Sequence, residues 1–132
     1  SRDLIAKLIN ELISELPIDF QNVTLIGFSQ GTILSYAVAL SYPEKVKNVI
    51  ALSGHINTDL LVPGYEKNDF RHLNLFISHG TVDQVIPVEW ARKAPELLRK
   101  LGIEATYKEY PIGHGVSPQN FYDFRNWLEN HK

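Results

Sequence analysis

LIGFSQGTILSYA, residues 25–37, is the stretch from which the fold of this chain is best inferred. A short apolar run with β-branched members, residues 23–28, ends in the sequence GFSQG (residues 27–31) and is followed by a second apolar stretch. This pattern predicts a buried strand that turns directly into a helix over residues 30–41. We expect the glycines on either side of Ser29 to relieve crowding at this turn, which would hold the serine strained and exposed above a sheet.

The same alternation of strand and helix patterns continues along the chain. Upstream, apolar residues at helical spacing over 4–16 predict an amphipathic helix that Pro17 stops. Downstream, the patterns predict three further strands and two further helices, namely strands at 46–52, 73–78 and 104–110 and helices at 88–101 and 117–130. Apolar strands that alternate with helices predict an α/β fold whose mostly parallel sheet is covered by helices on both faces.

Residues 55–72 differ from the rest of the chain because they are polar and rich in turn signals, with Pro63-Gly64 near the middle. We expect a surface excursion with a short helical turn. Its apolar residues, together with Val85 and Ile86, are candidates for contact with a substrate. Ordinary packing is the simpler explanation and the one we favour.

Composition limits the classes of function that need to be considered. The chain has 132 residues, which suggests one domain, and 44% of them are hydrophobic. Its net charge of −2 gives no basic footprint for nucleic acid, and no apolar run approaches the roughly 20 residues that cross a bilayer. Cysteine is absent, which fits a reducing compartment, so we expect a cytoplasmic location and no zinc–thiolate site.

The serine of the quoted stretch needs partners before it can act as a nucleophile, because a hydroxyl is a poor nucleophile without a base. The strand predicted at 73–78 runs into a loop that contains Asp83, and the strand at 104–110 runs into a loop where glycines flank His114. In parallel sheets, functional groups gather beyond the carboxyl ends of the strands. The chain order of Ser29, Asp83 and His114 is also the serine–acid–histidine order of α/β-hydrolases.

Each partner also has a plainer interpretation. Asp83 alone could cap a turn or the following helix, and His114 alone could be a surface-loop histidine. Their joint placement after successive strands favours the catalytic interpretation. Other histidines and aspartates fit that order or position less well, namely His55, His79, His131, Asp59, Asp69 and Asp123.

Several short motifs together resemble the carboxyl-terminal part of the phospholipase/carboxylesterase family of α/β-hydrolases, which includes acyl-protein thioesterases. The matching pieces follow the family along nearly all of the chain: GFSQG at 27–31, LSG at 52–54, SHG at 78–80 with Asp83 and Pro87, and Gly113-His114. The resemblance implies an α/β-hydrolase fold and hydrolysis of small-molecule carboxylic esters or thioesters. It also implies that no cofactor or metal is needed, and that the enzymes often act as homodimers.

Two departures from the family pattern matter. Thr32 stands where the family usually has another glycine, at the start of the predicted helix. Family members also carry about another third of chain upstream, with the first strands and a glycine-rich loop that donates one oxyanion-hole amide. The other amide would come from Gln30, the residue after the nucleophile. We therefore expect residues 1–132 to be one α/β-hydrolase domain that is incomplete at its N-terminus. Because losing one oxyanion donor typically costs about 10²–10³ in rate, these residues alone are expected to be a poor catalyst.

The sequence thus predicts a serine hydrolase that works through Ser29, His114 and Asp83 and an acyl-enzyme intermediate. Two alternatives stay open. One is another hydrolase on the same fold, similar to dienelactone hydrolases or to peptidases. The other is a non-catalytic fragment of the fold that serves binding or regulation.

Overall fold

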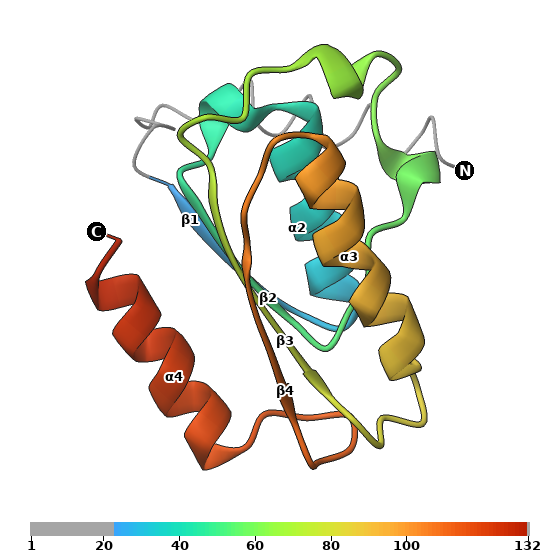
Figure 1. Ribbon diagram of the computed structural model, residues 1–132, viewed down its shortest axis with the longest axis vertical. Helices are drawn as coiled ribbons and strands as arrows, with labels where there is room; N and C mark the ends of the chain where they lie inside the picture. The colour runs from blue at the N-terminus through green and yellow to red at the C-terminus, as the bar shows by residue number, and fades with distance from the viewer. Residues whose placement is uncertain (1–22, 132) are drawn as a thin grey trace.

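The computed structural model describes residues 23–131, which form a parallel sheet with helices on both faces (Figure 1). The helix predicted at 4–16 lies outside the described residues. The strands are β1 (Thr24–Phe28), β2 (Asn48–Leu52), β3 (Asn74–Gly80) and β4 (Thr106–Tyr110). The helices are α2 (Gln30–Ser41), α3 (Val88–Lys100) and α4 (Pro118–Glu129), with short 3₁₀ helices at Pro43–Lys45, Thr58–Leu60 and Tyr65–Lys67. Within the described residues, the elements agree with the predicted order and nearly with the predicted bounds.

The strands lie in the order β1-β2-β3-β4, and each neighbouring pair is parallel. Phe28 at the end of β1 pairs with Leu52 at the end of β2, and Leu52 pairs with Ser78 of β3. β3 runs two residues further, to Gly80, which pairs with Tyr110 at the end of β4. The carboxyl ends of all four strands therefore meet at one edge of the sheet, where we expect polar groups from successive loops to come together.

Strand alternation divides the core into two layers. Val49 and Leu75 belong to a large apolar cluster with residues of α2 and α3, whereas Ile50 and Phe76 pack against Trp127 of α4. Successive side chains of a strand point to opposite faces, so neighbouring positions enter different layers. Figure 1 shows the corresponding arrangement, with α4 on one side of the sheet and α2 and α3 on the other. The predicted covering of both faces is confirmed.

β1 is less buried than its apolar sequence predicts. Ile26 and Phe28 are 57% and 44% exposed, although the strand register places them on the same face as Ile50 and Leu52. Within the described part of the chain, α4 packs over β2 and β3 on this face, and its cluster includes no residue of β1. The prediction of a buried strand is therefore wrong for this side of β1.

The segment between β2 and β3 carries two of the 3₁₀ helices, as its turn signals predict. Leu61 and Phe70 are buried in the larger apolar cluster, and Leu60 and Tyr65 pack against it. These side chains help to close the core beside α2, so ordinary packing explains them.

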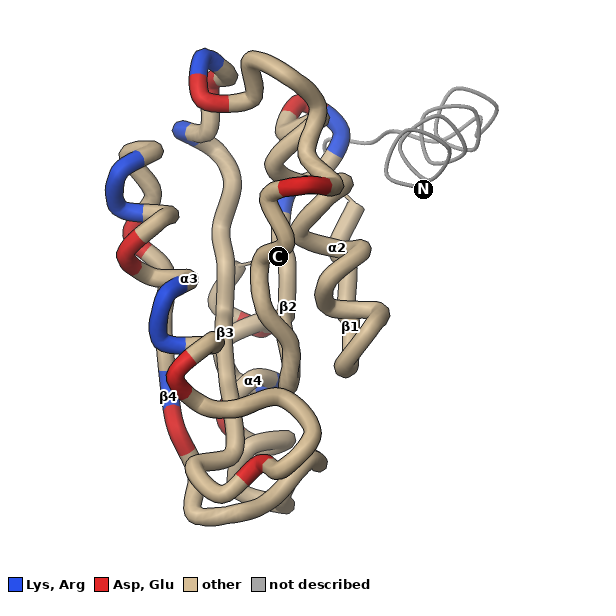
Figure 2. The backbone as a smooth tube through the Cα atoms, turned by 90° about the vertical axis from the view of Figure 1, so that its right-hand side faces the viewer, with Lys and Arg blue, Asp and Glu red and all other residues tan. Residues whose placement is uncertain are grey.

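Charged residues of both signs are interspersed along the described backbone, including along α3 (Figure 2). None of the helices among residues 23–131 combines the length and the apolar character that a membrane crossing needs.

Candidate active site

Ser29 occupies a strained turn between β1 and α2. Its backbone has φ 56° and ψ −114°, and its N–H donates a hydrogen bond to the carbonyl oxygen of Leu52 at 3.0 Å. A positive φ is uncommon for a residue with a side chain and is often found at functional sites. A Cβ at Gly27 would lie 2.6 Å from backbone atoms of Gly31 and Thr32, so the turn requires glycine at position 27.

Crowding does not explain the second glycine of the turn. A Cβ at Gly31 would meet no atom of the described residues within 4 Å, so a side chain fits there among them. The expectation that both flanking glycines relieve crowding holds for Gly27 and is wrong for Gly31, because only Gly27 lies under the first turn of α2.

Thr32, which departs from the family pattern, binds the turn to the neighbouring strand. Its buried hydroxyl donates to the carbonyl oxygen of Leu52 at 2.6 Å and accepts from the N–H of Leu52 at 3.0 Å. A Cβ at Gly54 would lie 2.6 Å from the Thr32 side chain and 2.9 Å from the carbonyl oxygen of Ser29. The absence of a side chain at Gly54 therefore makes room for the threonine, a compensation that no local sequence pattern indicates.

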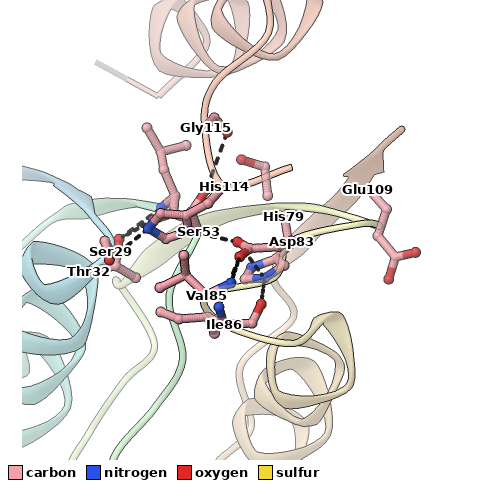
Figure 3. A network of polar contacts seen from close by, with 12 residues as sticks. Ser29, Thr32, Ser53, His79, Asp83, Val85, Ile86, Glu109, His114 and Gly115 are labelled. Atoms are coloured by element: carbon pink, nitrogen blue, oxygen red, sulfur yellow. Dashed lines mark hydrogen bonds and ion pairs between the residues drawn. The ribbon is translucent and has the colours of Figure 1, made fainter. Parts of the chain in front are cut away.

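The structure brings Ser29, His114 and Asp83 into one hydrogen-bonded row, although they are far apart in the sequence (Figure 3). The Oγ of Ser29 lies 3.0 Å from Nε2 of His114, and Nδ1 of His114 lies 2.8 Å from Oδ2 of Asp83. A carboxylate only accepts hydrogen bonds, so Nδ1 carries the proton and Nε2 is left to accept from the serine hydroxyl. The His114 side chain is 19% exposed, and the Phe28 ring lies 5.0 Å from its ring centre to centre.

Asp83 is held as a carboxylate at the buried end of this row. Its side chain is 0% exposed, and its Oδ1 accepts the backbone N–H groups of Val85 at 2.8 Å and Ile86 at 2.9 Å. Burial acts to raise the pKa of this carboxyl, but the hydrogen bonds from His114, Ile86 and Val85 together outweigh burial and lower it. The acid therefore stays ionised and faces His114 with its second oxygen.

Backbone contacts between the loops explain how Asp83 and His114 meet. The N–H of Thr81 donates to the carbonyl oxygen of Tyr110 at 2.8 Å, and the N–H of Val82 donates to that of Ile112 at 3.1 Å. A Cβ at Gly80 would overlap the carbonyl oxygens of Ile112 and of the next residue, so glycine permits the close approach. The loops after β3 and β4 are thus joined side by side.

Ser53 joins the end of β2 to the same assembly and was not singled out by sequence reasoning. It has φ 53°, it is buried, and its hydroxyl donates to the carbonyl oxygen of Gly115 at 3.3 Å. Its only sequence signal is the LSG motif, which marks the end of a strand. The contact supports the loop that holds His114.

The other acidic and histidine candidates have other contacts. Asp69 binds Arg71, Asp123 accepts from the hydroxyl of Tyr110, and the ring of His131 stacks on Trp127. Asp59 donates its backbone N–H to Asn57. His79 differs from these, because its Nε2 lies 3.3 Å from Oδ2 of Asp83. Among the described residues, no group of three potential ligands is arranged to hold a metal ion.

Gln30 is the first residue of α2, directly after Ser29. The first N–H groups of a helix have no acceptor within the helix, and the helix dipole places partial positive charge at this end. The backbone N–H of Gln30 is therefore a suitable donor for an oxygen that becomes negative beside Ser29.

A cavity of about 380 Å³ lies between α3 and the segment that follows β2. The ring of Trp90, in the first turn of α3, contacts the ring of His55 edge to face at 5.2 Å between centres. Both residues belong to segments that leave the carboxyl edge of the sheet, the edge that also holds Ser29. The lining consists of His55, Ile56, Thr58, Trp90, Lys93, Ala94 and Leu97.

Comparison with known proteins gives consistent matches. The family model described as phospholipase/carboxylesterase matches residues 1–132. Acyl-protein thioesterase 1 of Emericella nidulans is 29% identical over 133 residues, covering 98% of this chain and 55% of that protein. Carboxylesterase SOBER1 of Arabidopsis thaliana is 27% identical over 110 residues, covering 83% of this chain and 48% of that protein.

Comparison with solved structures points to the same family as these sequence matches. The crystal structure of a phospholipase/carboxylesterase from Dyadobacter fermentans superposes with a TM-score of 0.79 at 25% identity, covering 94% of this chain and 61% of that one. The present chain spans about half the length of the curated relatives that it matches.

Proposed function

The chain belongs to the phospholipase/carboxylesterase family, and from this premise we propose that it supplies the catalytic residues of a serine hydrolase that cleaves carboxylic esters or thioesters. The observation that carries the proposal is the hydrogen-bonded row from Ser29 through His114 to Asp83. His114 lies within hydrogen-bond distance of both other members, as nucleophilic acyl transfer requires of the base.

In the proposed first step, the Ser29 oxygen attacks the carbonyl carbon of the substrate while Nε2 of His114 takes the hydroxyl proton. Asp83 keeps the imidazole in the tautomer that can accept this proton, and its negative charge stabilises the imidazolium that forms. His114 then gives the proton to the departing alcohol or thiol, which leaves an acyl group on Ser29. In the second step a water molecule, deprotonated by His114, releases the acid and restores the serine.

Negative charge develops on the carbonyl oxygen during both steps. We propose that the backbone N–H of Gln30 donates to this oxygen, because it lies beside Ser29 at the positive end of α2. The strained φ of Ser29 supports this role, since it presents the side chain at the helix start instead of within the helix.

The cavity beside Trp90 is the proposed site for the apolar part of the substrate. Replacing Trp90 by alanine is expected to lower kcat/KM for an octanoyl ester more than for an acetyl ester, because the large ring no longer contacts a long chain. A difference of about 1–2 kcal/mol, or roughly 5- to 30-fold, is the expected scale for losing such an apolar wall. Kinetics with p-nitrophenyl acetate and octanoate measure it. Tyr122→Ala on α4, an exposed aromatic away from the cavity lining, is the matched control. An equal loss for both esters would contradict the proposed position of the chain.

A panel of substrates tests the reaction class. The protein is offered a p-nitrophenyl butyrate ester, an S-butyryl thioester, a lactone and a peptide p-nitroanilide, with the Ser29→Ala variant as background. Turnover of the ester or thioester by the wild-type protein, well above the lactone and the anilide, is the expected result. Preferred turnover of the lactone or anilide would favour another hydrolase on this fold. A folded protein that turns over none of the four would favour a non-catalytic role.

A cytoplasmic location and a homodimer are further proposals. The absence of cysteine supports the first, and the family resemblance supports the second. Cell fractionation tests the location, and the mass measured by light scattering at micromolar concentration tests the oligomeric state.

A further inference from the structure

His79 is a fully buried histidine beside the site, and the proposed reaction gives it no role. It lies near the end of β3, and its side chain is 0% exposed. Its Nε2 lies 2.7 Å from the carbonyl oxygen of Ile86 and 3.3 Å from Oδ2 of Asp83. In Figure 3 the His79 ring lies beside Asp83, away from Ser29.

These contacts determine the tautomer of the ring. A carbonyl oxygen only accepts hydrogen bonds, so Nε2 of His79 must carry a proton. Nδ1 of His79 is buried and has no hydrogen-bond partner within the described part of the structure. One ring nitrogen therefore donates to the turn that holds the acid, and the other is left unpaired.

His79 contacts the turn of Asp83 in two ways. It anchors Ile86 through the carbonyl oxygen, and the same residue donates its own N–H to Oδ1 of Asp83 at 2.9 Å. The nitrogen Nε2 of His79 also lies 3.3 Å from Oδ2, the oxygen that accepts from Nδ1 of His114 at 2.8 Å. Oδ2 thus has the Nε2 atom of His79 as a close neighbour, and the hydrogen bond to the carbonyl oxygen of Ile86 holds the far end of the turn from 83 to 86.

Packing alone does not explain a histidine at this position. A leucine fills a similar volume in an apolar environment without leaving a buried nitrogen unpaired, and buried polar atoms without partners are destabilising. The residue gains from being histidine only through the N–H on Nε2, which donates to the carbonyl oxygen of Ile86.

We propose that His79 is a positioning residue for the acid of the triad, holding Asp83 in the orientation that His114 requires. This inference extends the proposed function, and the effect of His79 on the reaction rate depends on that function. The contact itself, in which Nε2 of His79 donates to the turn of residues 83–86, follows from the distances and does not depend on the proposed function.

The charged groups around His79 come from three elements. Asp83 and His114 belong to the loops after β3 and β4, and Glu109 of β4 pairs in register with His79. Glu109 is neutralised by Arg92 of α3, whose Nε lies 2.7 Å from its carboxylate. Asp83 is therefore the charged group closest to Nε2 of His79 among the described contacts.

The test uses three variants and a fluorophosphonate probe that reacts only with an activated serine. His79→Leu removes the donor, and His79→Gln keeps an amide N–H near the position of Nε2. His72→Leu is the control, because His72 contacts the carbonyl oxygen of Pro43 at the opposite end of the sheet. The rate constant for labelling Ser29 is measured at a fixed pH, with thermal unfolding of each variant alongside.

We expect His79→Leu to label about 10- to 100-fold more slowly, the usual scale for losing a group that orients a functional residue. His79→Gln recovers most of the rate, and His72→Leu matches the wild-type protein. Equal losses in both His79 variants, or no loss in either, would overturn the proposal.

The tautomer of His79 can be measured directly by NMR spectroscopy, without an assay of enzyme turnover. In ¹⁵N–¹H spectra of the wild-type protein, the proposal requires the Nε2–H tautomer of His79, and the Nδ1–H tautomer would overturn it. This measurement applies even if His79→Leu fails to fold. It also separates the two hypotheses: an unlabelled wild-type serine with an Nε2–H His79 refutes the proposed hydrolase and leaves the positioning contact intact.

Discussion

Replacing Asp83 by asparagine is expected to lower kcat by about 10⁴ while leaving the protein folded. The size of the effect follows from the tautomer, because an amide in place of the carboxylate can donate a hydrogen bond to Nδ1 of His114 and so move the ring proton to Nε2. A protonated Nε2 cannot accept the hydroxyl proton of Ser29, which lies 3.0 Å away. Hydrolysis of p-nitrophenyl butyrate at saturating substrate measures the loss.

Asp69→Asn is the matched control for this prediction. Asp69 also lies in a loop and binds a basic side chain, Arg71, but its carboxylate is exposed and it has no contact with His114. We expect its kcat to equal that of the wild-type protein. If Asp83→Asn retained more than about a tenth of the wild-type kcat, Asp83 would not be the residue that sets the tautomer.

Replacing Gly27 by alanine is expected to disrupt the turn at Ser29. The new Cβ would lie 2.6 Å from the carbonyl carbon and oxygen of Gly31 and from the backbone nitrogen of Thr32. Backbone atoms in the first turn of a helix cannot move away without breaking hydrogen bonds. The cost is therefore expected at or above the upper end of the overpacking range, about 3 kcal/mol. Chemical denaturation measures the free energy of unfolding of the variant.

Gly31→Ala separates crowding from the general effect of removing a glycine. Within residues 23–131, a Cβ at Gly31 meets nothing within 4 Å, and alanine favours a helix over glycine by about 1 kcal/mol. We expect this variant to be as stable as the wild-type protein or more stable. Similar losses at positions 27 and 31 would show that the turn does not depend on close approach at Gly27.

The order of strands and helices was predictable from the sequence because each element has its own local pattern. The apolar run before Ser29 and the run before Asp83 both become parallel strands whose ends meet at one edge. The loop positions of Ser29, Asp83 and His114 follow from that topology, and the structure places His114 within hydrogen-bond distance of both Ser29 and Asp83.

Features that depend on contact between distant segments were not predictable. The side chain of Thr32 occupies the space left by the missing side chain of Gly54, across the gap between α2 and the end of β2. The sequence around neither residue indicates this contact. The exposure of Ile26 and Phe28 depends on where α4 packs, which strand hydrophobicity does not reveal. His79 comes directly after a predicted strand, and the sequence pattern indicates no role for its ring. Its contact with Ile86 forms only in the folded chain.

Fluorophosphonate labelling followed by peptide mass spectrometry tests the central claim most directly, because only a serine activated by a neighbouring base reacts. The account predicts one adduct, on the peptide that contains Ser29, formed by the wild-type protein and lost in both Ser29→Ala and His114→Ala. A folded wild-type protein that takes up no probe, or that carries the adduct on a different residue, would contradict it.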